Sequence, residues 1–149
     1  MPLFYKIAKG EYKAHIIWED EKHIAFLTPY PNTRGFSVVA TKRHYPSYCF
    51  DLDDNTLSDL VCACKKVGKL LDQKLEDVGR TGLIMEGFGI DHVHAKLFPM
   101  HGTANMEKWK PILSKERKFF NQYEGYISSH DGEKMEDAEL ARIVSIIKA

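Results

Sequence analysis

Residues 92–98 carry the side chains best suited to chemistry in this chain. On a β-strand, side chains two residues apart share a face, so His92, His94 and Lys96 are predicted to line one side, facing a cleft. The opposite side is apolar and is expected to pack on a core; its members are Val93, Ala95 and Leu97. A neutral imidazole can attack phosphorus, a second one can orient it, and an ammonium can neutralise developing negative charge. The segment therefore indicates phosphate chemistry, with an ordinary strand of alternating polarity as the alternative.

The elements that must position this segment are predicted from the spacing of apolar residues. Short runs of β-formers bounded by turn residues predict strands over 15–18, 24–27, 36–40, 81–86 and 92–98. Apolar residues three or four apart predict helices over 53–75 and 136–148. Asp53 or Asp54 is the expected N-cap of the first helix, and Gly79 its expected stop. The order of these elements indicates an α+β domain built on a mainly antiparallel sheet.

Composition limits the classes of partner. The chain has 149 residues, 44% of them hydrophobic, which suits one self-sufficient globular domain. Its 21 Lys and Arg balance 21 Asp and Glu, and this neutrality argues against long nucleic acid or an anionic membrane surface as partner. The sequence suggests neither a secretory leader nor a membrane-spanning run, so we expect a cytoplasmic protein.

The three cysteines argue against a disulfide framework. Cys49, Cys62 and Cys64 are odd in number and lack Cys-x-x-Cys spacing, so no zinc ribbon is encoded either. A metal site that uses the His-x-His pair would need at least three ligands, and only Asp91 adjoins the pair. We therefore expect neither a metal nor a cofactor.

Residues 92–98 resemble the histidine triad motif, in which His, apolar, His, apolar, His and two apolar residues run along one strand of nucleotide hydrolases and transferases. The order of residues is similar to that family over roughly 4–102, including Trp18 to Leu27 and the Gly35 to His44 strand with its basic turn. The resemblance implies an HIT-like fold with a five-stranded sheet, a long helix packed on it and a C-terminal helical extension. We expect residues 1–102 to form the domain core and 103–149 the extension.

The resemblance also implies roles for the motif residues. His94 matches the central histidine, which attacks the α-phosphate to form a nucleotidyl-histidine intermediate, and His92 matches the histidine that positions it. Lys96 stands where the family has its third histidine, and we expect it to hold the phosphate oxygens. The implied activity is hydrolysis or nucleotidyl transfer on a dinucleoside polyphosphate or nucleoside phosphoramidate. The alternative is a weakened nucleotide-binding or protein-interaction module with the same fold.

Four further residues are candidate substrate-binding residues. Thr28 stands where the family often has an acidic residue that holds the ribose. Gly87 and Gly89 belong to a shorter loop that replaces the family's Ala-Gly-Gln-Ser run, and His101 could supply part of a missing phosphate contact. His44 is either a structural residue or a remnant of a metal site.

The resemblance implies a homodimer as well. The segment after the motif contains aromatic side chains suited to such a contact, namely Trp109, Phe119, Phe120, Tyr123 and Tyr126.

Overall fold

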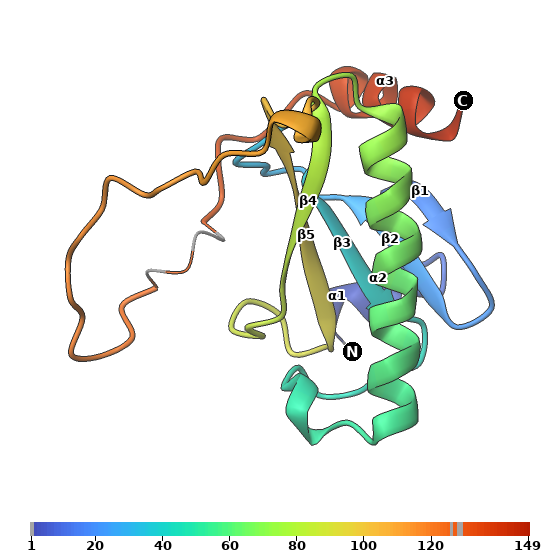
Figure 1. Cartoon of the computed structure of the whole chain (residues 1–149). Coiled ribbons are helices and arrows are strands. Elements are labelled where there is room, and N and C mark those ends of the chain that lie inside the picture. Colours follow the sequence, from blue (N-terminus) through green and yellow to red (C-terminus); the bar gives the residue numbers. More distant parts are fainter. Residues whose placement is uncertain (1, 126, 128–129) are drawn as a thin grey trace.

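A five-stranded antiparallel sheet lies at the centre of the protein (Figure 1). The computed structural model describes residues 2–125, 127 and 130–149, so Tyr126 lies outside the described residues. The strands are β1 (His15–Glu19), β2 (His23–Leu27), β3 (Ser37–Thr41), β4 (Val78–Ile84) and β5 (His94–His101). Their order in the sheet is β1-β2-β3-β5-β4, and every neighbouring pair is antiparallel. The predicted α+β class and antiparallel sheet are confirmed.

The helices are α1 (Leu3–Ala8), α2 (Asp54–Lys74) and α3 (Asp137–Lys148), and short 3-10 turns span Cys49–Asp51 and Met106–Lys108. Asp53 is the N-cap of α2, because its side chain accepts a hydrogen bond of 2.7 Å from the Thr56 N–H. The helix ends at Lys74, so the predicted stop at Gly79 was wrong. Gly79 lies instead within β4, where its N–H donates to the Thr103 hydroxyl.

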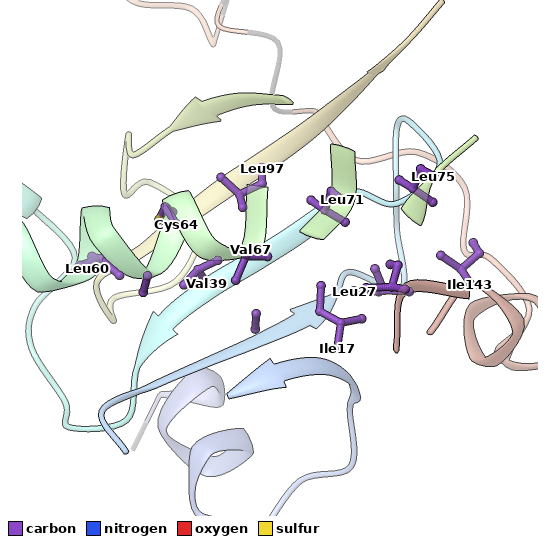
Figure 2. Close-up of a cluster of buried hydrophobic side chains, with 14 of the residues drawn as sticks. Ile17, Leu27, Val39, Leu60, Cys64, Val67, Leu71, Leu75, Leu97 and Ile143 are labelled. Carbon is purple, nitrogen blue, oxygen red and sulfur yellow. The ribbon is translucent and has the colours of Figure 1, made fainter. Parts of the chain in front are cut away.

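The main core fills the space between α2 and one face of the sheet (Figure 2). Leu60, Val67 and Leu71 recur along the inner side of α2 and are completely buried. They meet Val39 and Leu97 from the two central strands. Each such side chain contributes roughly 1.5–3 kcal/mol of burial free energy, so this layer holds β5 firmly in place.

The opposite face of the sheet carries a smaller apolar cluster. Phe4 and Ile7 of α1 pack there against Phe26 and Val38. The sequence did not predict α1, because six residues are too few to show helical periodicity. This second layer matters for function, since the motif histidines lie on the same side of the sheet.

The motif strand begins and ends later than predicted. β5 starts at His94, leaving His92 just outside it, and it continues through Pro99 to His101. The strand tolerates Pro99 because β3 stops pairing at Leu97, and β5 beyond this point is paired with β4 alone.

The C-terminal part of the chain returns to the domain. Leu140, Ile143 and Ile147 of α3 are buried in the main core, next to β1 and α2. After the 3-10 turn at Met106–Lys108, residues 109–125 extend away from the sheet (Figure 1), and Trp109 and Phe119 are exposed there. The division of the domain at residue 102 stays a prediction, as does the use of these aromatic side chains in a dimer.

Within the described residues, no helix is long and apolar enough to cross a membrane.

Candidate active site

The two sides of the motif segment differ as predicted. Val93, Ala95 and Leu97 belong to the core under α2. His94 and Lys96 occupy the opposite face of β5, next to Ala40 and Val38 of β3. The predicted opening of this face onto a cleft was wrong at the histidines, because His92 is 0% and His94 only 3% exposed. Phe4 of α1 covers this face, and its ring centroid lies 4.6 Å from that of His94.

The His94 ring has one defined tautomer. Its Nδ1 lies 2.6 Å from the carbonyl oxygen of His92, and because a carbonyl only accepts, Nδ1 must carry the proton. A neutral ring then has an unprotonated Nε2 with a free lone pair. Burial lowers the pKa of His94 below 6.5, outweighing the opposing effect of this hydrogen bond, and the charge of Lys96 lowers it further. His94 is therefore a neutral imidazole suited to nucleophilic attack.

The side chain of His92 points toward β3 and His44. Its Nε2–H donates to the Thr41 carbonyl at 2.6 Å, and its Nδ1 lies 3.1 Å from Nδ1 of His44. Burial lowers the pKa of His92, so the ring is neutral, its Nδ1 accepts, and His44 Nδ1–H donates. The main-chain carbonyl of His92, rather than its ring, makes the hydrogen bond to His94.

Lys96 is engaged in an ion pair. Its Nζ lies 3.0 Å from Oε1 of Glu86, and the two side chains are 18% and 9% exposed. Glu86 follows β4, and extending the register in which Ile84 faces Lys96 places it diagonal to Lys96 on the same face. Sequence analysis missed this partner, although the antiparallel register would have indicated it.

His101 is not brought together with the motif histidines. It lies at the other end of β5, seven residues from His94, which corresponds to roughly 23 Å along a strand. Its Nε2–H donates to the Arg34 carbonyl at 2.8 Å. The prediction that His101 contributes to phosphate binding beside the motif histidines is therefore corrected. An extended strand separates residues at its two ends by its full length.

The other substrate-binding candidates lie in different surroundings. Thr28 follows β2, two strands or roughly 10 Å from β5, and its hydroxyl accepts from the Tyr30 N–H. Gly87 has φ of 73°, and a Cβ there would lie 2.8 Å from the Ser47 carbonyl, so close packing requires a glycine. At Gly89, a Cβ would have no atom within 4 Å from any described residue beyond its two chain neighbours. Substrate contacts by these three residues stay predictions.

A hollow close to the motif does not include His94 in its lining. It has a volume of about 330 Å³ and is lined partly by His23, Thr41 and Arg43. Its lining meets the motif at Thr41, whose hydroxyl oxygen lies 3.3 Å from Nε2 of His92, and at Tyr45, whose carbonyl accepts from the Val93 N–H at 2.9 Å. We therefore assign the candidate site from the chemistry of the His94 ring. Among the described residues, no group of three or more His, Cys, Asp or Glu side chains is arranged to hold a metal ion.

Residues 9–103 match the HIT domain, which is most of the chain and includes the whole motif. The chain belongs to the HIT domain family. An uncharacterized HIT-like protein of Methanocaldococcus jannaschii is 30% identical over 117 residues, covering 75% of this chain and 89% of that protein. The adenosine 5'-monophosphoramidase hnt1 of Schizosaccharomyces pombe is 31% identical over 98 residues, covering 65% of this chain and 72% of the yeast protein.

Solved structures support the same fold. The crystal structure of a hypothetical histidine triad nucleotide-binding protein of Sulfolobus tokodaii superposes with a TM-score of 0.67 at 24% identity. The similarity covers 97% of this HIT protein and 88% of the archaeal chain. The predicted HIT-like architecture is therefore confirmed.

Buried neutral histidines predict that this HIT protein loses stability on mild acidification. His92 and His94 have lowered pKa values when folded, whereas in the unfolded chain they titrate near 6.5. As pH falls below about 6.5, the unfolded state binds more protons, so the free energy of unfolding falls by up to about 1.4 kcal/mol per pH unit for each ring. The loss stops once pH passes below the folded-state pKa values.

Urea unfolding at pH 7.5, 6.5, 5.5 and 5.0 measures this loss. The range stays above the usual titration of carboxyl groups, which separates the histidine effect from theirs. The His94→Gln variant should show a shallower dependence than wild type. A free energy of unfolding that is constant from pH 7.5 to 5.0 would contradict the assignment of neutral rings.

Proposed function

We propose that this HIT protein hydrolyses a nucleoside phosphate derivative at the α-phosphate through a covalent nucleotidyl-His94 intermediate. The observation that carries the proposal is the His94 ring, which is neutral, held by the His92 carbonyl and has its Nε2 lone pair free of a proton. Such a ring is a competent nucleophile toward phosphorus at neutral pH. The naming of the Schizosaccharomyces pombe relative as an adenosine 5'-monophosphoramidase supports the same chemistry.

The reaction proceeds in two steps. The lone pair of His94 Nε2 forms a bond to the α-phosphorus while the bond from phosphorus to the leaving group breaks, and the leaving atom takes up a proton where its basicity requires one. Water then attacks the same phosphorus, the bond to Nε2 breaks, and the water proton is released to solvent. The products are a nucleoside monophosphate, the leaving group and neutral His94; another nucleophile in place of water would give transfer.

The neighbours of His94 have separate tasks in this scheme. The His92 carbonyl holds the Nδ1–H of His94 and stabilises the positive charge that develops on the ring after attack. The Thr41 carbonyl and the His44 ring fix the His92 ring from both of its nitrogens. Lys96 approaches the phosphate oxygens and offsets their charge. Thr28 is proposed to bind a sugar hydroxyl.

Assays on wild-type protein test the proposal. Adenosine 5'-phosphoramidate and diadenosine tetraphosphate are incubated with the protein, and release of AMP is followed by chromatography. The proposal expects AMP and, on rapid quenching at alkaline pH, a protein adduct heavier by one adenylyl group that maps to His94. Absence of AMP from both substrates would overturn it.

One observation favours the second candidate, a nucleotide-binding module without turnover. Glu86 already neutralises the charge of Lys96, and the His94 ring is almost wholly buried. A module of this kind would bind AMP in calorimetry but release none from either substrate. The proposed homodimer and cytoplasmic location are independent of this choice, and light scattering tests the former.

Lys96→Ala is predicted to weaken the binding of nucleotide while leaving the binding of nucleoside nearly unchanged. The substitution removes the cation and leaves the Glu86 carboxylate to repel phosphate, so we expect the dissociation constant of AMP to rise about tenfold or more. Isothermal titration with AMP and with adenosine measures both affinities. An unchanged AMP affinity would show that Lys96 does not face the phosphate.

A further inference from the structure

The proposed reaction gives Lys96 a role but assigns none to Glu86, the residue with which Lys96 forms an ion pair. The pair joins β5 to the end of β4, and its two side chains are mostly buried. The pair is close to the nucleophile, because His94 is two residues from Lys96 on the same face of β5. The charges of both Lys96 and Glu86 act on the pKa of His94. A carboxylate at a phosphate-cleaving site requires a reason, since it opposes the binding of anions.

Among the described residues, the two charged side chains that act on the His94 ring have opposite signs. His92 and His94 are neutral, Lys96 contributes one positive charge and Glu86 one negative charge. One cation can offset the α-phosphate that His94 attacks. A leaving group with further phosphates would bring two or more additional negative charges toward a site where Glu86 cancels the available cation.

We propose that Glu86 is a specificity-determining residue that selects against phosphate-bearing leaving groups and in favour of amines. This inference rests on the proposed function, since it concerns which bond at the α-phosphorus is broken. In a nucleoside phosphoramidate, the P–N bond breaks and the departing nitrogen takes up a proton from solvent. Its charge becomes more positive during departure, and a nearby carboxylate stabilises that change.

In a nucleoside polyphosphate, the P–O bond breaks and the electron pair stays on the leaving phosphate. Its negative charge grows at the bridging oxygen, and the same carboxylate destabilises it. Glu86 therefore acts in opposite directions on the two classes of leaving group, while the attack of His94 is the same for both. This opposition makes the ratio of the two rates a direct measure of the charge at position 86.

The experiment compares kcat/KM for adenosine 5'-phosphoramidate with kcat/KM for diadenosine tetraphosphate. The Glu86→Gln variant keeps the size and an oxygen acceptor for Lys96 but removes the negative charge. We expect it to lower the ratio of kcat/KM for the phosphoramidate to kcat/KM for the polyphosphate by about tenfold or more relative to wild type. Because both rates come from one protein sample, a partly unfolded variant still gives a valid ratio.

Two variants serve as controls. Glu86→Asp retains the charge and should keep the wild-type ratio, even where the shorter side chain reduces both rates. Glu76→Gln removes the same charge from an exposed position beside β4, near the His101 end of β5, and should also keep the ratio.

The outcomes separate the inference from the function on which it rests. AMP release from both substrates with equal ratios in wild type and Glu86→Gln overturns the role of Glu86 and leaves the proposed function standing. A wild-type protein that releases AMP from neither substrate overturns the proposed function and this inference together. A falling ratio in Glu86→Gln, with unchanged ratios in Glu86→Asp and Glu76→Gln, supports the inference.

Discussion

Replacing His94 with alanine is expected to reduce release of nucleoside monophosphate by at least about 10³-fold, because no covalent intermediate can form without the nucleophile. The substitution also empties a buried position, where the ring is 3% exposed and contacts Phe4. Loss of activity from misfolding must therefore be separated from loss of chemistry. Steady-state rates are measured together with far-UV circular dichroism and urea unfolding.

The second variant, His94→Asn, separates these causes. In the wild type, the His92 carbonyl accepts from the His94 Nδ1–H. The asparagine amide of the variant can donate to the same carbonyl, but it has no nitrogen lone pair for attack. Both variants should lack the adenylyl adduct. His101→Ala, at the far end of the same strand, should keep wild-type turnover. Turnover by a folded His94→Asn variant at the wild-type rate would overturn the covalent mechanism.

Activity should also depend on pH through His94. Its lowered pKa means that the neutral nucleophile persists below pH 6.5, and kcat/KM should fall only as pH drops through this lower value.

Phe4→Ala is expected to reduce the free energy of unfolding by about 3 kcal/mol and to raise the pKa of His94 toward 6.5. Phe4 is 7% exposed, and its ring packs edge-on against both Phe26 and His94. Its removal leaves a cavity and admits water to the imidazole, so the penalty for charging the ring decreases. The same side chain therefore contributes to stability and to the protonation state of the nucleophile.

Urea unfolding measures the first effect, and an NMR titration of the His94 ring measures the second. Phe119→Ala is the matched control, because that ring is 85% exposed and its removal should change the free energy of unfolding by no more than about 0.5 kcal/mol. Equal losses in the two variants, or an unchanged His94 titration in Phe4→Ala, would show that α1 does not shield the nucleophile.

Local patterns in the sequence were sufficient to predict the main elements. The three-to-four spacing of Leu60, Val67 and Leu71 predicted α2, since only a helix places these side chains on one buried face. The alternation of His94 and Lys96 with Ala95 and Leu97 predicted which side of β5 faces the core. Both predictions depend on residues a few positions apart, and the backbone geometry of one element determines them.

The sequence by itself therefore determined the fold class, the buried faces of α2 and β5, and the motif that identifies the HIT domain. Only the tertiary structure decided that α1 covers His94 and that Glu86 forms an ion pair with Lys96. The same holds for the hydrogen bond between the rings of His92 and His44, which are 48 residues apart in the sequence. These contacts join residues far apart in the chain, so they depend on strand register and on packing between layers. A six-residue helix such as α1 is stable only through the apolar surface that it buries, and no local pattern encodes that surface.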